Sequence, residues 1–254
     1  MEILSPLRQL QNDGCQYAFY FARDGQQPVF HSSETSNPEC ASTLFLSASI
    51  IKVPILLAWV HLERTGFVHR GELCNLDDEP QVEGAGFSWL LRARQLPYQD
   101  VLLMMIALSD NLCTNLVIRR IGIDRLQKVF HDTLGLQDTQ IQRKLMDYDA
   151  RARGLDNWIS ARDCIRLYDC IDQLRHDERA WVESMLAVNQ DDLLLRRSVQ
   201  RDTLTFYHKT GSMTGVLHDW GYTDRCRIFL LTQNVKDEPA AYHVFGQLGR
   251  LMVD

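Results

Sequence analysis

Ser49 and Lys52 form the first pair whose residue types and spacing could do covalent chemistry. A serine hydroxyl is a poor nucleophile until a neighbouring base takes its proton. Residues three apart at the start of a helix lie one turn apart on the same face, so the Lys52 amine would be within reach of the Ser49 hydroxyl. A lysine acts as a base near neutral pH only where burial or a nearby positive charge lowers its pKa. The pair therefore predicts nucleophilic attack by Ser49 on a carbonyl.

Two further strings could supply what such an attack needs: Ser109-Asp110-Asn111 and Lys209-Thr210-Gly211. The charge of Lys209 could lower the pKa of Lys52, and Ser109 could relay a proton to a leaving amine. The free N–H of Ser49 at the helix start could donate to a developing oxyanion. Each string alone is a weak signal, but all three in this order are hard to obtain by chance.

The sequence around the three strings predicts the elements that must position them. The run I-I-K-V-P-I-L-L-A-W-V-H-L after Ser49 is apolar almost all round, as in a buried central helix. Pro54 in this run predicts a tight or bent helix start. The S-D-N string lies between an amphipathic helix through Leu108 and a second helix that ends at Gly122. The K-T-G string follows the alternating run L-T-F-Y, which is typical of a strand.

Read as S-x-x-K, S-D-N and K-T-G, the strings resemble the motif set of the serine β-lactamase and penicillin-binding protein superfamily, most closely its class A branch. Ser109 lies 60 residues after Ser49 and Lys209 lies 100 residues after Ser109, similar to class A spacings. The stretches E-G-A-G-F-S-W-L-L and M-M-I-A-L-S-D-N-L-C-T-N-L-V-I-R-R-I-G also resemble family members. The likeness covers nearly the whole chain.

The resemblance implies a catalytic role for four of these residues. Ser49 would be the acylated nucleophile, with Lys52 as its base partner. Ser109 would shuttle the proton. Lys209 would lie beside them and contribute its positive charge. The backbone amides of Ser49 and Ser212 would form the oxyanion hole.

The resemblance also implies a substrate-binding set. Asn111 would contact the substrate backbone. The K-T-G strand would hold a carboxylate of a small-molecule substrate through Lys209, Thr210 and Ser212, with Gly211 between them. We therefore expect the substrate to be a carboxylate-bearing β-lactam or a peptide-like compound.

His218 departs from the class A pattern. It lies nine residues after Lys209, where class A enzymes often carry an arginine that helps to bind the substrate carboxylate. A histidine there could bind an anion when protonated, or neutral polar groups otherwise. A strand histidine hydrogen-bonded to Asp219, with no other role, is equally consistent with the sequence.

The omega loop departs from the class A pattern as well. Class A enzymes hydrolyse their acyl-enzyme with a glutamate in an E-x-x-L-N pattern, and the corresponding region here, Q-I-Q-R-K-L-M-D-Y-D-A-R-A-R-G-L-D-N-W, contains no glutamate. Asp147 is the nearest carboxylate and could orient a water as a general base, while Asp149 and Asp156 are poorer candidates. We favour the alternative that Asp147 pairs with Arg143 or Arg151 to hold the loop. The sequence therefore supports acylation more strongly than fast deacylation.

Composition limits the possible partners. The 254 residues are 45% hydrophobic and 24% charged, as in an ordinary globular protein. The net charge of −6 argues against a nucleic-acid surface. No span approaches the ~20 apolar residues of a membrane helix, so we expect no membrane partner. Lysine is scarce, with two of the five at motif positions, so composition alone does not account for the lysines there. The sequence does not predict the oligomeric state.

The cysteines bear on cofactors and on the compartment. The seven cysteines show no C-x-x-C and no metal-ligand spacing, so we expect no metal and no other cofactor. Their odd number favours a reducing compartment over a disulfide framework. The opening M-E-I-L-S-P-L-R-Q-L does not read as a signal peptide. We predict a cytoplasmic protein, or a periplasmic or secreted one if this is a mature form.

The order of elements predicts an α+β fold. We expect a short helix at about 3–12, strands at 16–22 and 28–31, a helix-rich block to about 197, three strands from about 203 and a closing amphipathic helix. The resemblance implies an antiparallel sheet flanked by terminal helices plus an all-α lobe, the β-lactamase/transpeptidase-like α/β/α sandwich. The α/β lobe would comprise 1–48 and 201–254, and the all-α lobe 49–200.

The predicted function is a serine hydrolase that opens a β-lactam or a related amide through an acyl-Ser49 intermediate. Two alternatives stay open. One is a non-lactamase peptidase, amidase, esterase or glutaminase of the same fold. The other is a protein that traps β-lactams because it cannot deacylate them.

Overall fold

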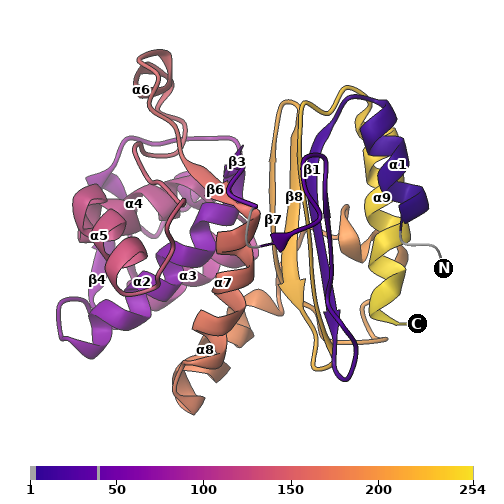
Figure 1. Cartoon of the computed structure of the whole chain (residues 1–254). Helices are drawn as coiled ribbons and strands as arrows, with labels where there is room; N and C mark the ends of the chain where they lie inside the picture. Colours follow the sequence, from indigo (N-terminus) through magenta and orange to yellow (C-terminus); the bar gives the residue numbers. More distant parts are fainter. Residues whose placement is uncertain (1–3, 39–40, 254) are drawn as a thin grey trace.

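A five-stranded antiparallel sheet forms the centre of the molecule in the computed structural model, which describes residues 4–38 and 41–253 (Figure 1). The strand order β2-β1-β9-β8-β7 brings strands from both ends of the chain side by side. The strands are β1 (Gln16–Arg23), β2 (Val29–Ser32), β7 (Tyr207–Met213), β8 (Val216–Tyr222) and β9 (Cys226–Gln233). The predicted α+β class and the antiparallel sheet are confirmed.

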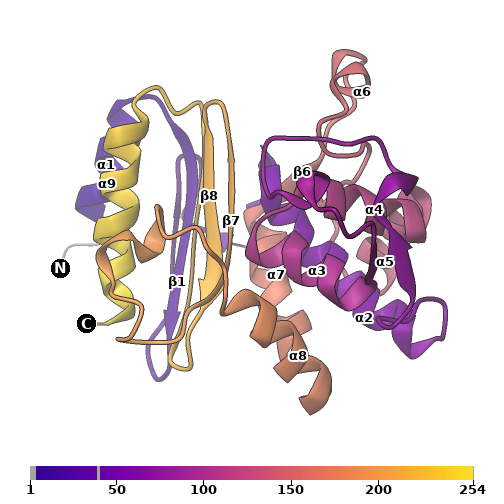
Figure 2. The same ribbon diagram turned by 180° about the vertical axis from the view of Figure 1, so that it is seen from behind.

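Helices from the chain ends cover one face of this sheet (Figures 1 and 2). They are α1 (Leu4–Asn12) and α9 (Glu238–Gly249), with the short 3-10 turns η5 (Leu195–Ser198) and η6 (Arg250–Met252). Residue 3, where the first helix was expected to begin, lies outside the described residues. Strand β1 is apolar on both sides because both faces of the sheet are covered. Tyr17, Phe19 and Phe21 pack toward the terminal helices, whereas Ala18 and Tyr20 pack toward the other face.

A helical lobe covers the opposite face of the sheet. Its helices are α2 (Lys52–Arg64), α3 (Tyr98–Ala107), α4 (Asn111–Ile121), α5 (Ile123–Asp132), α6 (Tyr148–Ala152), α7 (Ala161–Asp172) and α8 (His176–Leu186), with 3-10 turns η3 (Leu76–Asp78) and η4 (Ser88–Leu90). Two small antiparallel pairs join β3 (Leu44–Leu46) to β6 (Trp158–Ser160) and β4 (Leu73–Asn75) to β5 (Gln95–Pro97). Ten of the 13 residues of α2 are buried, which confirms the predicted central helix.

The start of α2 is tight, as Pro54 predicts. A 3-10 turn, η2 (Ala48–Ile51), precedes the helix, and the α-helix proper begins at Lys52. Pro54 therefore falls in the first turn of the α-helix, where backbone N–H groups have no partner within the helix and its missing donor costs little. This arrangement lets a proline stand five residues after the nucleophile without breaking the helix.

Within 4–38 and 41–253, no helix is long and apolar enough to cross a membrane. The described cysteines are all buried and free: Cys15, Cys74, Cys113, Cys164, Cys170 and Cys226. Cys40 lies outside the described residues.

Candidate active site

Ser49 lies on the 3-10 turn η2, between the short strand β3 and the buried helix α2. Ala48 just before it has a φ of +43°, a value that residues with a Cβ rarely adopt, so the chain turns sharply there. The backbone N–H of Ser47 donates to the carbonyl of Asn157 at 2.8 Å and holds the turn against the segment that follows α6. Lys52 Nζ lies 2.9 Å from Ser49 Oγ. One helical turn thus brings the hydroxyl and the amine into direct contact.

Lys52 has more oxygen neighbours than an ammonium group can satisfy. Besides Ser49 Oγ, its Nζ lies 2.6 Å from the Ser109 carbonyl, 3.0 Å from Ser109 Oγ and 3.1 Å from Asn111 Oδ1. An ammonium has three protons to donate, whereas a neutral amine has a lone pair that can accept the proton of Ser49. Burial, and then the charge of Lys209, hold the pKa of Lys52 well below its usual value. The environment favours Lys52 as a neutral base.

The S-D-N string forms the turn between α3 and α4, with Ser109 at a φ of +55°. The carboxylate of Asp110 is buried and caps α4 by accepting from the N–H of Cys113 at 2.9 Å. It also accepts from the N–H and the hydroxyl of Ser88, at 2.8 and 2.7 Å. Asn111 donates to the carbonyl of Glu83 at 3.1 Å while its oxygen faces Lys52. Asp110 therefore holds the turn, and its two neighbours point into the site.

The K-T-G string lies on β7 beside the nucleophile. Lys209 is fully buried, and its Nζ donates to the carbonyl of Thr210 at 2.8 Å. Burial lowers the pKa of Lys209 to about 8, against the opposing influence of Asp191 and Asp219. A Cβ on Gly211 would come within 2.9 Å of the backbone nitrogen of Ser49. Glycine is needed there because the strand approaches the nucleophile turn so closely.

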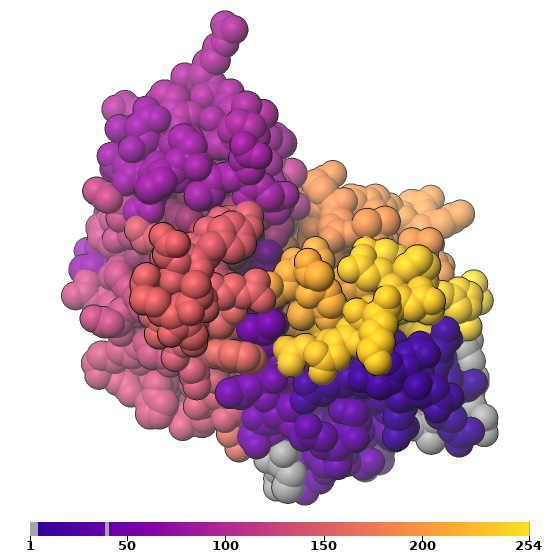
Figure 3. Space-filling view, turned by 90° about the horizontal axis from the view of Figure 1, so that it is seen from above, coloured from indigo at the N-terminus to yellow at the C-terminus, as the bar shows by residue number. Residues whose placement is uncertain are grey.

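These groups open into one cleft of about 710 Å³ between the helical lobe and β7. Figure 3 shows the hollow between the two parts of the molecule. Motif residues that line it are Ser49, Ser109, Asn111, Thr210 and Ser212. The apolar part of the wall comes from Phe87, Leu145, Met146, Tyr148 and Met213. The two lysines lie beneath this surface, where they can act on groups bound in the cleft without being exposed to solvent.

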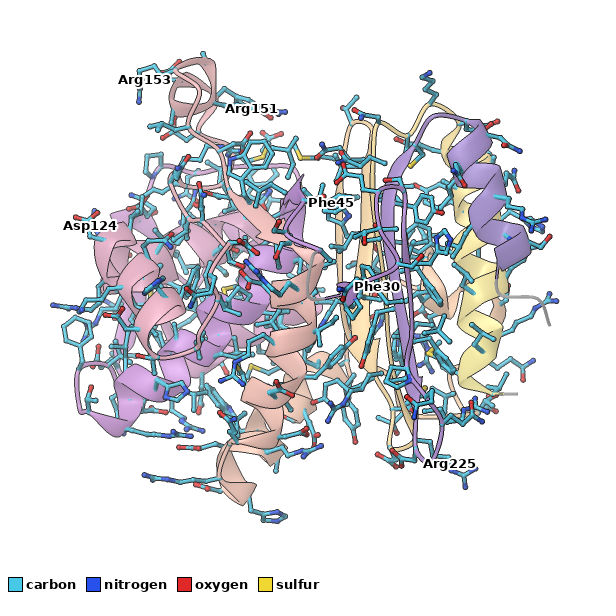
Figure 4. All side chains as sticks on the ribbon, viewed as in Figure 1. Phe30, Phe45, Asp124, Arg151, Arg153 and Arg225 are labelled. Carbon is cyan, nitrogen blue, oxygen red and sulfur yellow. The ribbon has the colours of Figure 1, made fainter. Side chains whose placement is uncertain are left out.

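The omega segment, residues 143–157, projects with α6 above the helical lobe, where Figure 4 labels Arg151 and Arg153. Asp147 caps α6 by accepting from the N–H of Ala150 at 2.9 Å, and it does not line the cleft. Asp149 is exposed. Asp156 lines the cleft and is bound by Arg143 at 2.7 Å and by Arg151 at 3.3 Å. The predicted pairing of Asp147 with one of these arginines is wrong, because Asp156 takes both.

The omega segment presents a leucine to the cleft. The side chain of Asn115 accepts from the N–H of Leu145 at 2.7 Å and donates to its carbonyl at 3.0 Å. The role of Asn115 was not predicted from the sequence. Its position four residues after Asn111, on the same face of α4, could have indicated it. The two bonds fix the backbone of Leu145, and with it Met146, over the cleft.

His218 is not brought to the cleft surface. Its ring is buried on β8, with Nε2 2.8 Å from the carbonyl of Leu46 and Nδ1 accepting from the N–H of Thr232 at 3.1 Å. Burial lowers the pKa of His218 to about 4, so it is neutral at pH 7. Asp219 is hydrogen-bonded instead to His208, at 3.0 Å. In this structure His218 holds β3, which leads to the nucleophile.

No group of three His, Cys, Asp or Glu side chains in the described part of the chain is placed to hold a metal ion.

Comparisons with known proteins identify the family of the chain. The model of the "Beta-lactamase enzyme family" matches residues 23–254. A search of curated proteins finds no match.

Solved structures share the fold over nearly the whole chain. A β-lactamase from Sphaerobacter thermophilus is 22% identical with a TM-score of 0.82, over 98% of this chain and 93% of that one. A mutant of PBP-A, described as an acyl-enzyme complex with penicillin G, is 24% identical with a TM-score of 0.82, over 99% and 94%. An ancestral class A β-lactamase is 18% identical with a TM-score of 0.82, over 99% of both chains.

Proposed function

Because the chain belongs to the β-lactamase enzyme family, a family of hydrolases that act on amide C–N bonds, we propose that it opens a β-lactam or a related amide through an acyl-Ser49 intermediate. One observation carries this proposal. Lys52 Nζ lies between the two serine hydroxyls, 2.9 Å from Ser49 Oγ and 3.0 Å from Ser109 Oγ. A base placed in this way can take a proton from one hydroxyl and pass it on through the other.

The acylation step follows from these contacts. Ser49 Oγ attacks the carbonyl carbon while its proton moves to the neutral Lys52 amine. The oxyanion is stabilised by the backbone N–H groups of Ser49 and Ser212. When the C–N bond breaks, the leaving nitrogen takes a proton from Ser109, which Lys52 then reprotonates. The products are an ester on Ser49 and a free amine, with Lys52 neutral again.

A β-lactam is the appropriate first substrate. It presents its carboxylate on the side of the leaving nitrogen, where Lys209, Thr210 and Ser212 can meet it. PBP-A, which shares the fold, was captured in mutant form as an acyl-enzyme with penicillin G. This precedent supports a β-lactam as a covalent probe of Ser49.

Slow hydrolysis of the acyl-enzyme is the second part of the proposal. The carboxylates that line the cleft in the described part of the chain are Asp156 and Asp191. Asp156 is held in ion pairs by Arg143 and Arg151, so its carboxylate is already engaged by protein groups. The omega segment otherwise turns Leu145 and Met146 toward the cleft. A water above the ester would thus lack the usual carboxylate base from this segment.

The test is to mix the protein with a chromogenic cephalosporin and to follow both hydrolysis and intact mass. We expect a burst of one equivalent, a covalent adduct on the protein and slow turnover afterwards. Ser49→Ala should abolish both the burst and the adduct, since it removes the proposed nucleophile. An unchanged burst or adduct in Ser49→Ala would show that the nucleophile is misassigned. Fast turnover without a detectable adduct would contradict slow deacylation.

Asp147→Asn tests the remaining omega-loop candidate. Asparagine can also cap a helix, so the variant should retain the α6 turn. We expect the lifetime of the adduct to stay within about twofold of that of the parent protein, because Asp147 does not line the cleft. A lifetime longer by about tenfold or more would identify Asp147 as the general base.

A further inference from the structure

The loop 189–191 is fixed at the end of the cleft where β7 meets the S-D-N turn. The side chain of Asn189 accepts from the N–H of Asp191 at 3.0 Å and donates to the carbonyl of His208 at 3.1 Å. The N–H of Gln190 donates to the carbonyl of Ala107 at 3.0 Å. His208 directly precedes Lys209, and Ala107 lies two residues before Ser109. The loop is therefore tied to both motif strings at once.

Asp191 is the unpaired carboxylate of the cleft. It lines the same cleft as Ser49, Thr210 and Ser212, and its Oδ1 accepts from the N–H of Leu193 at 3.1 Å. Among the described residues, no Lys, Arg or His side chain lies within ion-pair distance of it. Asp156, in contrast, has two arginines, and the neighbouring Asp192 is paired with Arg201. The negative charge of Asp191 is thus available to a bound molecule.

The positive charge at this end of the cleft is limited. Lys209 is buried beneath the surface and donates to a backbone carbonyl. His218, the second cation that the sequence suggested, is buried and hydrogen-bonded to Leu46. A substrate group that enters beside Thr210 and Ser212 therefore lies above the buried ammonium of Lys209. The carboxylate of Asp191, which has no ion-pair partner among the described residues, lies in the wall of the same cleft. A lone carboxylate is repelled by Asp191, and an ammonium is attracted.

We propose that Asp191 selects substrates by the charge of the group attached to the leaving nitrogen. It slows acylation of Ser49 by substrates in which this group is a lone carboxylate, and it favours substrates in which this group carries an ammonium. This inference rests on the proposed acylation of Ser49 and narrows the class of its substrate. The natural leaving group would be an amine that carries a further amino group. β-Lactams would then be captured despite Asp191 rather than with its help.

The test compares three forms of one chromogenic cephalosporin: the free acid, its methyl ester and its 2-aminoethyl ester. The second-order rate constant for acylation of Ser49 is measured for the parent protein, for Asp191→Asn and for Asp224→Asn. Asp224 is the matched control, because it is exposed in the turn between β8 and β9, beside Arg225 (Figure 4), and does not line the cleft. Its replacement changes the net charge by the same amount as that of Asp191.

We expect Asp191→Asn to raise the rate constant of the free acid about tenfold and to lower that of the aminoethyl ester by a similar factor. The methyl ester should stay within about twofold, and Asp224→Asn should leave all three within about twofold. Equal effects of Asp191→Asn on the three compounds, or none, would overturn the proposal. So would the same pattern in Asp224→Asn, because it would then arise from net charge.

A failure of the proposed function would look different. If none of the three compounds acylates the parent protein, the acyl-Ser49 proposal fails by itself. Calorimetric dissociation constants of the same three compounds then decide the role of Asp191 separately. Opposite shifts for the acid and the aminoethyl ester in Asp191→Asn would support charge selection, and parallel shifts would overturn it.

Discussion

Two buried lysines with different surroundings share the base of the cleft. Lys52 contacts four oxygens of the two serines and Asn111, whereas Lys209 donates to a single backbone carbonyl. The charge of Lys209 lowers the pKa of Lys52, so a neutral Lys52 beside a charged Lys209 is favoured. This is the protonation state that acylation of Ser49 by an anionic substrate needs.

A pH dependence follows for single residues. The pKa of Lys209 is about 8, so the residue loses its charge as the pH rises through that value. Acylation by the free acid of a cephalosporin should then fall, since the carboxylate loses its cation. The methyl ester should show no such fall. The measurement is the second-order acylation rate constant of both compounds from about pH 6 to about pH 10. A parallel fall for both compounds would show that Lys209 acts on the chemical step rather than on the carboxylate.

At the scale of elements, the S-D-N turn depends on a close approach between Gly86 and Asp110. Gly86 has a φ of +77°, and a Cβ on it would come within 2.1 Å of Asp110 Oδ2. Gly66 has a similar φ of +74° but nothing within 4 Å of the position of its Cβ. A comparison of alanine substitutions at the two glycines therefore distinguishes the cost of the positive φ from the cost of steric contact.

Gly86→Ala should therefore destabilise the protein more than Gly66→Ala. We expect a loss of about 1 kcal/mol in the free energy of unfolding for Gly66→Ala, from the positive φ alone. For Gly86→Ala we expect about 2–4 kcal/mol, because Asp110 would also have to move from its hydrogen bonds with Ser88 and Cys113. Urea unfolding measures both values. Equal losses would mean that the turn adapts without disturbing Asp110.

At the scale of the whole molecule, helix α7 joins the helical lobe to the sheet. The hydroxyl of Tyr168 lies within hydrogen-bond distance of the carbonyls of Gly221 and Ile228, at 3.0 and 2.9 Å. The indole N–H of Trp220 donates to the carbonyl of Cys164 at 2.8 Å. One hydrophobic core contains residues of the sheet face and of the central helices alike. The two parts are expected to unfold together.

Tyr168→Phe tests this connection. Loss of the buried hydroxyl should lower the free energy of unfolding by about 1–2 kcal/mol. Circular dichroism and tryptophan fluorescence should still report one coincident transition in urea. Tyr242→Phe is the matched control on the outer helix α9, where the ring is only half-buried, and it should cost less than about 0.5 kcal/mol. Two separated transitions in the parent protein would contradict a single cooperative unit.

The sequence alone determined whatever depends on neighbours along the chain. The spacing of Ser49 and Lys52 fixes their contact because one helical turn is a local geometry. The alternation of β7 and the apolar run of α2 placed the other motifs on the correct kinds of element. The sheet made from both ends of the chain was expected from the family resemblance rather than from periodicity.

Only the tertiary structure decided which distant side chains meet. Asp156, not Asp147, pairs with the arginines of the omega segment, and His208, not His218, bonds Asp219. Asp191 lines the cleft because its loop is tied to β7 through Asn189 and to α3 through Gln190. Several aspartates and arginines lie in one short segment, and their spacing along the chain does not favour one ion pair over another. The closure of the loop in the folded chain selects among these ion pairs. Strand register decides the position of the histidines, because alternate residues of a strand face opposite sides of the sheet and the packing of the whole chain sets which side faces the cleft.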